Sequence, residues 1–315
     1  MNPEYWKGRS VLVTGGAGFL GFHLVEALVR GGARVAVLDC LEEPVKLRGL
    51  LDKIKYIKGD ASDWEGPSRD QGEIEVIFHL AAFSAPAAAQ AEPELTYRKN
   101  VRGTANLLGT ARNCNVQKFI FVSAGSLYTT PPEYLPIDEK HPIDPYQGVY
   151  VTTKRIGELL CDDFQKNYGV PTLYFRLFNT YGPRQSLPFL IPSFYAEAME
   201  KGSITVKNGS IRRDFTYCTD MVEALLRGGA ADYCGGPLNL GSGVEHRVEE
   251  IARKVGEILG VEVKCLNQEV FGPTRAVCDN SLAKQVLGWR PTHSLDEGLR
   301  LTLQSFKEEK VLTKV

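Results

Sequence analysis

A glycine-rich segment near the N-terminus constrains the fold of this chain more than any other feature of the sequence. It reads VLVTGGAGFLG, from Val11 to Gly21, and joins a short apolar run to a stretch with helical periodicity. In that setting Gly15 permits a tight turn, Gly18 lets the backbone approach a pyrophosphate, and Gly21 allows close packing of helix on strand. The N-terminus of the helix adds unpaired N–H groups and the positive end of its dipole. The segment therefore predicts a dinucleotide-binding loop after the first strand of an α/β sheet.

The first 180 residues alternate short apolar runs with longer amphipathic stretches. Most of the runs are apolar throughout, which is typical of parallel strands covered on both faces. Repeated strand–helix–strand units imply right-handed crossovers, so the sequence predicts an α/β fold with a doubly wound parallel Rossmann sheet. The expected strands are residues 10–15, 33–39, 55–60, 75–82, 118–123 and 172–177, and the expected helices are residues 19–32, 100–114 and 150–168.

The pattern changes after about Leu177, where proline and glycine become frequent. We expect residues 1–178 to form the cofactor-binding domain and residues 179–315 mainly to form a smaller substrate-binding lobe. Residues 210–241 are expected to return to the first domain. Because ligands of doubly wound proteins bind at the carboxyl ends of the strands, the second lobe is predicted to close over that edge.

Composition excludes several classes of function. Hydrophobic residues make up 43% of the chain, and 37 Lys and Arg balance 38 Asp and Glu to a net charge of -1, so nothing points to nucleic acid or an anionic membrane. The seven cysteines and five histidines form no cluster with metal-ligand spacing, which predicts no metal site and reduced thiols of a cytoplasmic protein. The N-terminus lacks the apolar core of a signal peptide, and no apolar run approaches the ~20 residues that span a bilayer.

Asp39 ends the second expected strand, 18 residues after Gly21. A carboxylate at that place accepts hydrogen bonds from both hydroxyls of an adenosine ribose. It also repels the additional phosphate of NADP. The sequence therefore predicts NAD rather than NADP as the cofactor.

The order of short motifs resembles the extended short-chain dehydrogenase/reductase family, and within it the nucleotide-sugar epimerases and dehydratases. After TGGxGxxG the motifs are Asp39, GDASD at 59–63, HLAA at 79–82, Asn100, Tyr150-x-x-x-Lys154, RLFNTYGPRQ at 176–185, RRDFTYCTDMVEAL at 212–225, LNLGSG at 238–243 and LGWRPTHSLDEGL at 287–299. The match covers nearly the whole chain. It implies NAD as the cofactor, a nucleotide-diphosphate sugar with UDP as the favoured nucleotide, and a homodimer built on the two helices 100–114 and 150–168.

The same resemblance implies roles for individual residues. Asp60 should contact the adenine, and Asn100 should order the loop at the nicotinamide end. The full set of implied cofactor contacts is Gly15, Gly18, Phe19, Leu20, Gly21, Asp39, Asp60, Ala61, Leu80, Ala81, Ala82, Asn100, Tyr150 and Lys154. The implied contacts with the nucleotide diphosphate are Asn179, Arg184, Arg213 and Arg275. Guanidinium groups suit that role because they pair bidentately with phosphate oxygens.

Tyr150 and Lys154 lie four residues apart on an expected helix, so they share one face. A nearby ammonium, together with the positive nicotinamide ring of NAD+, favours a phenolate and is expected to lower the pKa of Tyr150. Tyr150 is then able to take a proton from a sugar hydroxyl while the ring takes the hydride. Alone, this spacing is more typical of an ordinary surface helix, and it indicates a catalytic pair only after the glycine loop upstream.

The segment FIFVSAGSLYTT departs from the family pattern. The family places Ser or Thr four residues before the tyrosine of this segment, which is Tyr128, and that position holds Ala124. Family dehydratases follow the hydroxyl with Asp-Glu, and family sugar-acid decarboxylases carry a Glu two residues before the tyrosine. Gly125 and Ser126 stand there instead. Neither of them titrates usefully near neutral pH.

Strand alternation suggests a replacement for the missing hydroxyl. If the chain stays extended, Ser126 shares a face with Ala124, because positions two apart face the same side. We therefore expect Ser126 to present the catalytic hydroxyl to the sugar. Ser123 is the second candidate, since Gly125 is able to rotate the backbone and bring it in. A purely structural role for both serines, in satisfying loop backbone groups, is equally compatible with the sequence.

Together these features favour an NAD-dependent nucleotide-sugar 4-epimerase that oxidises a sugar hydroxyl transiently and returns the hydride to the other face. This reaction needs a base and NAD but no additional Asp/Glu pair. The alternatives in the same family are a 4,6-dehydratase, a sugar-acid decarboxylase relying on Arg213, and a keto-sugar reductase. A non-catalytic NAD-binding sensor is a third interpretation, which Ala124 favours and the intact Tyr150 and Lys154 oppose.

Overall fold

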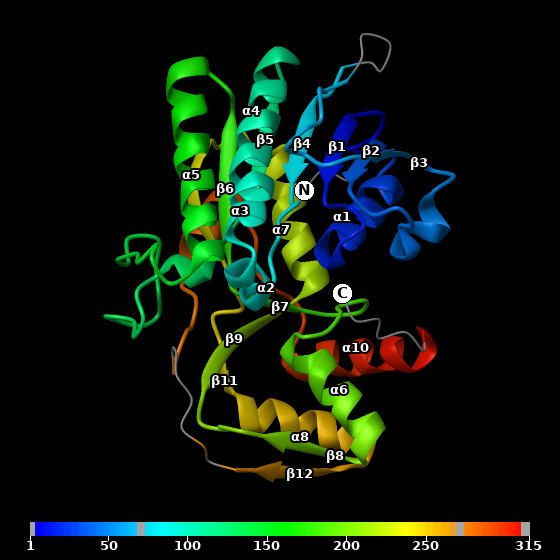
Figure 1. Ribbon diagram of the computed structural model, residues 1–315, viewed down its shortest axis with the longest axis vertical. Coiled ribbons are helices and arrows are strands. Elements are labelled where there is room, and N and C mark those ends of the chain that lie inside the picture. Colours follow the sequence, from blue (N-terminus) through cyan, green and yellow to red (C-terminus); the bar gives the residue numbers. More distant parts are fainter. Residues whose placement is uncertain (1–3, 68–72, 267, 269–273, 310–315) are drawn as a thin grey trace.

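The computed structural model describes residues 4–67, 73–266, 268 and 274–309. Figure 1 shows two lobes stacked along the long axis of the molecule, with the large sheet and its helices in the upper one. The expected α/β architecture is confirmed, because a seven-stranded sheet with helices on both faces forms the first lobe.

All seven strands of this sheet are parallel to their neighbours, in the order β10-β6-β5-β4-β1-β2-β3. The strands are β1 (Ser10–Thr14), β2 (Arg34–Asp39), β3 (Ile54–Lys58), β4 (Val76–His79), β5 (Lys118–Ala124), β6 (Thr172–Leu177) and β10 (Gly235–Leu240). The order reverses direction between β1 and β4. In open α/β sheets this switch point is where a crevice for ligands opens at the carboxyl ends of the strands.

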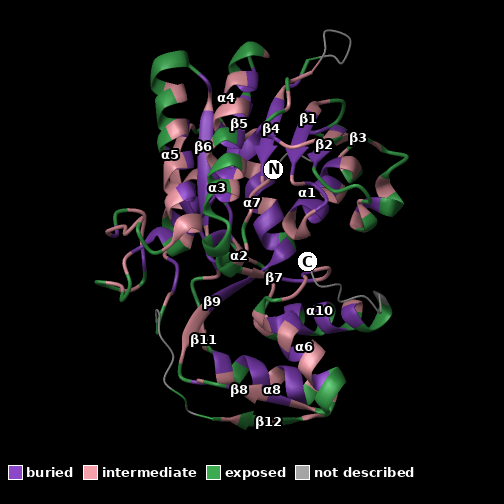
Figure 2. Cartoon of the chain, viewed as in Figure 1, coloured by how far each residue is buried: buried purple, intermediate pink, exposed green. Residues whose placement is uncertain are grey.

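Successive residues of β1 show why the sheet is covered on both sides. Val11 and Val13 pack in one hydrophobic cluster with residues of α1 (Phe19–Arg30) and α7 (Cys218–Ala230). Leu12 packs in another, with residues of α4 (Gly103–Asn113) and α5 (Val149–Tyr168). Figure 2 shows the resulting burial: the inner strands β1, β4, β5 and β6 are buried along most of their length, whereas the edge strand β3 is not. The apolar runs of the sequence therefore reflect two cores, one on each face.

Short helical segments connect these elements. They are η1 (Val45–Leu50), α2 (Pro86–Ala91), α3 (Pro93–Tyr97), the π-helical turn η3 (Arg98–Arg102) that leads into α4, and the 3-10 turn η4 (Gly125–Leu127) that follows β5.

The second lobe has its own hydrophobic core, which lies between two small sheets and three helices. One sheet contains β7 (Asn179–Tyr181), β9 (Arg212–Tyr217) and β11 (Glu245–Arg247), and the other contains β8 (Ser203–Val206) and β12 (Glu262–Cys265). The helices are α6 (Leu190–Lys201), α8 (Val248–Leu259) and α10 (Leu295–Glu309). In Figure 1 all three helices lie in the lower part of the molecule.

The chain crosses between the lobes more often than the sequence suggests. Within the segment 210–241, α7 and β10 pack with the large sheet, whereas β9 pairs with β7 and β11 outside it. The helix α9 (Ser281–Leu287) and Trp289 also join the hydrophobic cluster around β1. Neither the strand β10 nor the return of α9 and Trp289 to the first lobe was expected from the sequence.

All seven cysteines are free thiols. In the described part of the chain, no helix is long and apolar enough to cross a bilayer. Within the same residues, no group of His, Cys, Asp and Glu side chains is placed to hold a metal ion.

Candidate active site

The glycine loop has the geometry that a pyrophosphate requires. Gly15 adopts a φ of +71°, and a Cβ placed on it would lie 2.7 Å from the backbone nitrogen of Ala81. A Cβ on Gly21 would collide with the carbonyl of Gly15, so only glycine lets α1 approach β1 this closely. Phe19 and Leu20 begin α1, where backbone N–H groups have no partner within the helix. These features fit the phosphates of a dinucleotide.

Asp39 lies beside this loop, at the carboxyl end of β2. One of its carboxylate oxygens accepts from the backbone nitrogen of Ala17 at 2.9 Å, and the other accepts from that of Leu41 at 3.2 Å. These two hydrogen bonds fix the plane of the carboxylate and leave further lone pairs on each oxygen. The arrangement fits a ribose diol and places a negative charge where NADP carries its additional phosphate.

A direct prediction follows for cofactor choice. Replacing Asp39 by alanine or glycine should relax the preference for NAD over NADP, because the negative charge that repels the 2′-phosphate is removed. Titration of both cofactors against each variant measures the effect. Asp63→Ala is a matched control, since that carboxylate pairs with Arg98 and Arg102 on the surface. Tighter binding of NADP than of NAD by the unmodified protein would contradict the prediction.

Asp60 and Ala61 follow β3 at the same edge of the sheet. An oxygen of Asp60 accepts from the backbone nitrogen of Ser62 at 2.9 Å, and Lys99 lies 4.0 Å from the other oxygen. Burial alone would raise the pKa of Asp60, but the hydrogen bonds from Ser62 and the charge of Lys99 outweigh it and lower the pKa. The carboxylate is therefore held ionised as a hydrogen-bond acceptor, which is compatible with the amino group of an adenine.

A chain of hydrogen bonds connects Thr14, His79 and Thr104 next to the cofactor loop, and its contacts allow only one assignment of donors and acceptors. Thr104 Oγ1 donates to the carbonyl of Asn100 at 2.6 Å, so it accepts from His79 Nε2 at 2.9 Å. His79 Nδ1 then accepts from Thr14 Oγ1 at 2.8 Å, and that oxygen accepts from the backbone nitrogen of Ala81 at 3.3 Å. Burial lowers the pKa of His79 to about 3, so the ring is neutral.

This chain joins the strand before the glycine loop to the segment that holds Leu80, Ala81 and Ala82. The sequence identified His79 only as a histidine without metal-ligand neighbours. The sequence placed it within an expected strand over 75–82, whereas β4 ends at His79. No sequence spacing reveals that hydroxyls from β1 and α4 meet its two ring nitrogens.

Asn100 is 4% exposed and lies in the π-helical turn η3. Its side-chain oxygen accepts from the backbone nitrogen of Phe83 at 2.7 Å, and its amide nitrogen donates to Thr153 Oγ1 at 3.0 Å. Asn100 therefore connects the loop after β4 to the helix that carries Tyr150. This placement is compatible with its predicted role in ordering the loop, and π-helical turns frequently occur at functional sites.

Tyr150 and Lys154 lie on the first two turns of α5. Tyr150 is half-buried, and Lys154 is 3% exposed. The Lys154 ammonium donates to the carbonyl of Val122 at 2.7 Å and lies 5.8 Å from the centre of the Tyr150 ring. The bond to Val122 fixes the ammonium near the carboxyl end of β5, on the ligand-binding edge of the sheet.

In the protein without NAD, the ammonium by itself does not lower the pKa of Tyr150. Burial raises the pKa of Tyr150 to about 12, and burial lowers the pKa of Lys154 to about 8 against the opposing charge of Glu158. In the protein alone, desolvation therefore outweighs the attraction of an ammonium at this distance. Any lowering of the tyrosine pKa rests on the second factor considered above, the positive ring of NAD+.

Ser123 turns away from the position expected for a substrate-binding hydroxyl. Its Oγ donates to Glu158 Oε1 at 2.7 Å, and Glu158 is fully buried. Arg176 donates to both oxygens of the same carboxylate, at 2.8 and 2.7 Å, and Arg155 adds a contact of 3.0 Å. The backbone rotation that would bring Ser123 to the sugar is therefore not present, because its hydroxyl belongs to a buried ion pair.

Ser126 lies in a different local structure from the one expected. The chain leaves the extended conformation at Gly125 and forms the 3-10 turn η4, so the strand alternation that linked Ser126 to Ala124 ends there. Ala124 is 8% exposed, whereas Ser126 is exposed. A Cβ on Gly125 would lie 3.1 Å from the ring of Phe178, which leaves little room for a side chain. Ser126 thus offers an exposed hydroxyl just beyond the carboxyl end of β5.

The four residues expected on the substrate side are distributed over two places. Asn179 is exposed on β7 and donates to the carbonyl of Asp214 at 3.1 Å. Arg213 lies on β9, where burial lowers its pKa, and Arg275 forms two hydrogen bonds with Glu245, at 3.0 and 2.7 Å. These three residues belong to neighbouring segments of the second lobe.

Arg184 lies elsewhere. Its guanidinium stacks 4.0 Å from the centre of the Phe22 ring on α1 and donates to the carbonyl of Lys46 in η1. It adopts a φ of +64°, which is uncommon for a residue other than glycine. Arg184 thus connects the segment after β7 to α1 and η1 of the first lobe.

Residues 11–241 match the model of the NAD dependent epimerase/dehydratase family. With the glycine loop, the acid after β2 and the Tyr150–Lys154 pair in place, the chain belongs to this family of extended short-chain dehydrogenases/reductases and is an NAD-dependent enzyme. Family membership confirms the expected cofactor, and the sensor interpretation gives way to that of an enzyme.

Two relatives show how close the sequence lies to different activities. UDP-glucuronic acid decarboxylase 6 of Arabidopsis thaliana is 33% identical, over 97% of this chain and 91% of its own length. A UDP-glucose 4-epimerase of Mycolicibacterium smegmatis is 32% identical, over 95% of this chain and 98% of its own. These values are too similar to separate decarboxylase from epimerase.

Solved structures agree with the fold. An epimerase from Methanothermobacter thermautotrophicus superimposes with a TM-score of 0.89 at 30% identity and covers 98% of this chain and 95% of its own. A UDP-glucuronic acid 4-epimerase from Bacillus cereus, solved with UDP-glucuronic acid and NAD, gives a TM-score of 0.86 at 26% identity, over 95% of this chain and 99% of its own.

Proposed function

We propose that this protein is a nucleotide-diphosphate-sugar 4-epimerase, with UDP as the favoured nucleotide. The observation that supports this choice most strongly is the chemistry at the end of β5. The positions that carry acid and base groups in dehydratases and decarboxylases hold Gly125 and Ser126. Gly125 packs against Phe178, and Ser126 does not titrate near neutral pH. A transient oxidation followed by re-addition of hydride needs neither group.

In this proposal the bound NAD supplies the hydride acceptor. Tyr150 accepts the proton of the sugar 4-hydroxyl and later returns it. Lys154, held by the carbonyl of Val122, contributes a positive charge that favours the phenolate. His79, Thr14 and Asn100 hold the surrounding loops in place through their buried hydrogen bonds. The sugar must turn between the two hydride transfers so that its other face meets the hydride.

The second lobe would hold the nucleotide diphosphate. Arg213 and Arg275 lie on adjacent segments, because the backbone nitrogens of Arg212 and Asp214 donate to the carbonyls of Thr274 and Ala276. Arg275 would share its guanidinium between Glu245 and a phosphate, since one face of the fork already pairs with the carboxylate. Asn179, at the start of this lobe, would add an uncharged hydrogen-bonding group for the same diphosphate. A homodimer through α4 and α5 stays a prediction from the family resemblance.

The decisive experiment is incubation with a panel of UDP-, dTDP-, GDP- and CDP-sugars, followed by mass spectrometry and NMR of the products. A product of unchanged mass with an inverted C4 proton supports the epimerase. Loss of carbon dioxide from a sugar acid identifies a decarboxylase and contradicts the proposal, and loss of water identifies a dehydratase and contradicts it as well. The decarboxylase is the second candidate, because relatives of that activity cover nearly all of this chain.

Ser126 provides a further prediction. If its exposed hydroxyl replaces the one missing at Ala124, Ser126→Ala should slow turnover by roughly 10- to 1000-fold, as expected for one lost transition-state hydrogen bond. Ser123→Ala should slow it less, because Ser123 bonds to Glu158 rather than to substrate. Steady-state kinetics with the active sugar nucleotide measures both effects.

A rescue experiment separates this role from loop structure. If the hydroxyl of Ser126 contacts the sugar at a point that a side chain at the end of β5 also reaches, adding Ala124→Ser or Ala124→Thr to the Ser126→Ala variant should restore part of the turnover. A serine that only orders η4 cannot be replaced from position 124. A silent Ser126→Ala variant, combined with a gain of activity from Ala124→Thr in the parent, would show that the hydroxyl is absent rather than moved.

A further inference from the structure

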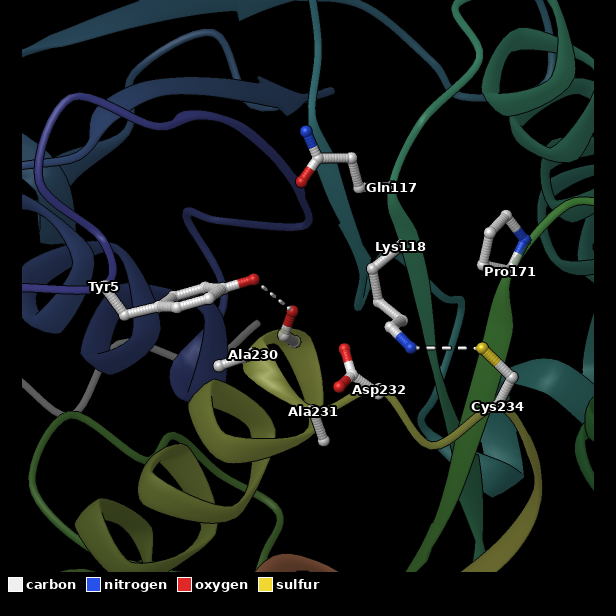
Figure 3. Close-up of a pocket in the computed structure, with 9 residues that line it drawn as sticks. Tyr5, Gln117, Lys118, Pro171, Ala230, Ala231, Asp232 and Cys234 are labelled. Carbon is white, nitrogen blue, oxygen red and sulfur yellow. Dashed lines mark hydrogen bonds between the residues drawn. The ribbon is translucent and has the colours of Figure 1, made fainter. Parts of the chain in front are cut away.

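A polar pocket lies on the edge of the large sheet opposite to the candidate active site. It has a volume of about 260 Å³ and is bordered by the amino ends of β5 and β6 and by the segment between α7 and β10. Figure 3 shows Lys118, Asp232 and Cys234 at this pocket, with Pro171 beside them. Because β5 has seven residues, its two ends are about 20 Å apart, so the pocket is remote from Lys154.

Lys118 and Cys234 face one another across this pocket (Figure 3). Lys118 is 4% exposed, and its Nζ lies 3.1 Å from Cys234 Sγ. The same nitrogen donates to the carbonyl of Tyr233 at 3.0 Å, which fixes the amine beside the sulfur. Cys234 is half-buried and lines the pocket, so a small reagent is able to reach its thiol. None of these residues takes part in the proposed reaction.

We propose that Lys118 and Cys234 form a site of oxidative modification, at which a hydroperoxide joins the two side chains covalently. The sulfur first attacks one oxygen of the hydroperoxide, the O–O bond breaks, and a sulfenic acid and water or an alcohol are formed. The deprotonated Nζ then attacks the same sulfur, the S–O bond breaks, and water leaves as the S–N bond forms. The pair loses two hydrogen atoms in total, and the hydroperoxide is the species that is reduced.

Proximity determines this outcome. A sulfenic acid condenses with whichever nucleophile reaches it first, and an amine held at contact distance competes at a very high effective concentration. The other thiols provide an internal comparison, since Cys40 is exposed and reaches the same oxidant from solvent. The cross-link would tie the first residue of β5 to the residue before β10, two strands that are separated by β6 in the sheet.

The test is peptide mapping of the purified full-length protein after treatment with hydrogen peroxide, removal of the excess by catalase, and alkylation of the remaining thiols. Digestion at acidic residues should yield one cross-linked pair that contains Lys118 and Cys234 and weighs two hydrogen atoms less than its two parts. Dithiothreitol should return both peptides to their original masses. A pair that is one oxygen atom heavier than this product supports the same site, because a second molecule of hydrogen peroxide transfers one oxygen atom to the linkage and is itself reduced to water.

Two variants complete the design. In Lys118→Met the cross-link should be absent, and Cys234 should instead react with dimedone as a sulfenic acid. Lys118→Arg keeps the positive charge but replaces the amine by a poorly nucleophilic guanidinium, so it should also lack the cross-link. It keeps the experiment decisive if Lys118→Met does not fold. If Cys234 in the parent gives a sulfenic or sulfinic acid, or does not react, while Cys40 is oxidised, the proposal is overturned. No sugar nucleotide enters this measurement, so its result is independent of the proposed epimerase activity.

Discussion

Replacing Tyr150 by phenylalanine is expected to lower turnover by roughly 100-fold or more while sugar-nucleotide binding stays nearly intact, as is typical when a general base is lost. The substitution removes one oxygen atom from the start of α5 and leaves the ring that packs near Lys154. Single-turnover kinetics and a binding titration with the same sugar nucleotide separate the two quantities. Near-normal turnover of the variant would show that Tyr150 is not the base.

Tyr146→Phe is the matched control for this substitution. Tyr146 lies four residues before Tyr150 and is 87% exposed, so removal of its hydroxyl should leave turnover unchanged. The two tyrosines also differ in how NAD should affect them. Burial raises the pKa of Tyr150 to about 12, and the positive ring of NAD+ should bring that pKa down.

Ultraviolet titration of tyrosinate tests the direction of this effect. With NAD present, one tyrosine should ionise at a lower pH than without it, and the change should be lost in Tyr150→Phe but not in Tyr146→Phe. Below the lowered pKa the base is protonated, so turnover should rise with pH through it. It should fall again as Lys154, with a pKa of about 8 in the protein alone, loses its charge.

The fold and cofactor could be predicted from the sequence because the evidence for them is local. Val11 to Gly21 contains a strand, a loop and a helix start within one short segment, and Asp39 follows at a fixed distance. The six strands expected from apolar runs are all present in the sheet. The seventh strand, β10, begins with two glycines and a proline, so its sequence lacks a strand signal. Pairing with β6 creates it, through contacts distant in sequence.

The site was harder to predict because it depends on the direction in which each side chain points and on how deeply it is buried. The spacing of residues along the sequence gives neither. Alternation along β5 placed Ser123 on the opposite face from Ala124, and its bond to Glu158 agrees with that direction. The same rule failed one residue later, since the chain turns at Gly125. The raised pKa of Tyr150 in the protein without NAD has a related reason. The sequence shows that an ammonium is near, but only the fold shows how much solvent both groups have lost.

The buried pair of Glu158 and Arg176 provides the largest expected effect on stability. Glu158 is fully buried, and its carboxylate accepts from Arg176, Arg155 and Ser123. Glu158→Leu should lower the free energy of unfolding by about 3–5 kcal/mol, because removing one partner leaves the Arg176 charge buried without compensation. Urea denaturation followed by circular dichroism measures this change. Glu26→Leu is the control, since its ion pair with Arg30 is on the surface and should contribute at most about 1 kcal/mol.

A double variant separates the contribution of this ion pair to stability from the effect of Glu158 on the charge of Lys154. Glu158→Leu combined with Arg176→Met replaces both charges by apolar groups and should recover most of the lost stability, as buried pairs often do when both partners are removed. It should not recover the charge of Lys154, whose pKa of about 8 is kept from falling further by the negative charge of Glu158. The fall of turnover at alkaline pH should therefore begin at a lower pH in the double variant than in the parent. If turnover in a stable double variant falls at the same alkaline pH as in the parent, Glu158 acts only through packing. The pKa of Lys154 would then not depend on the carboxylate one turn further along α5.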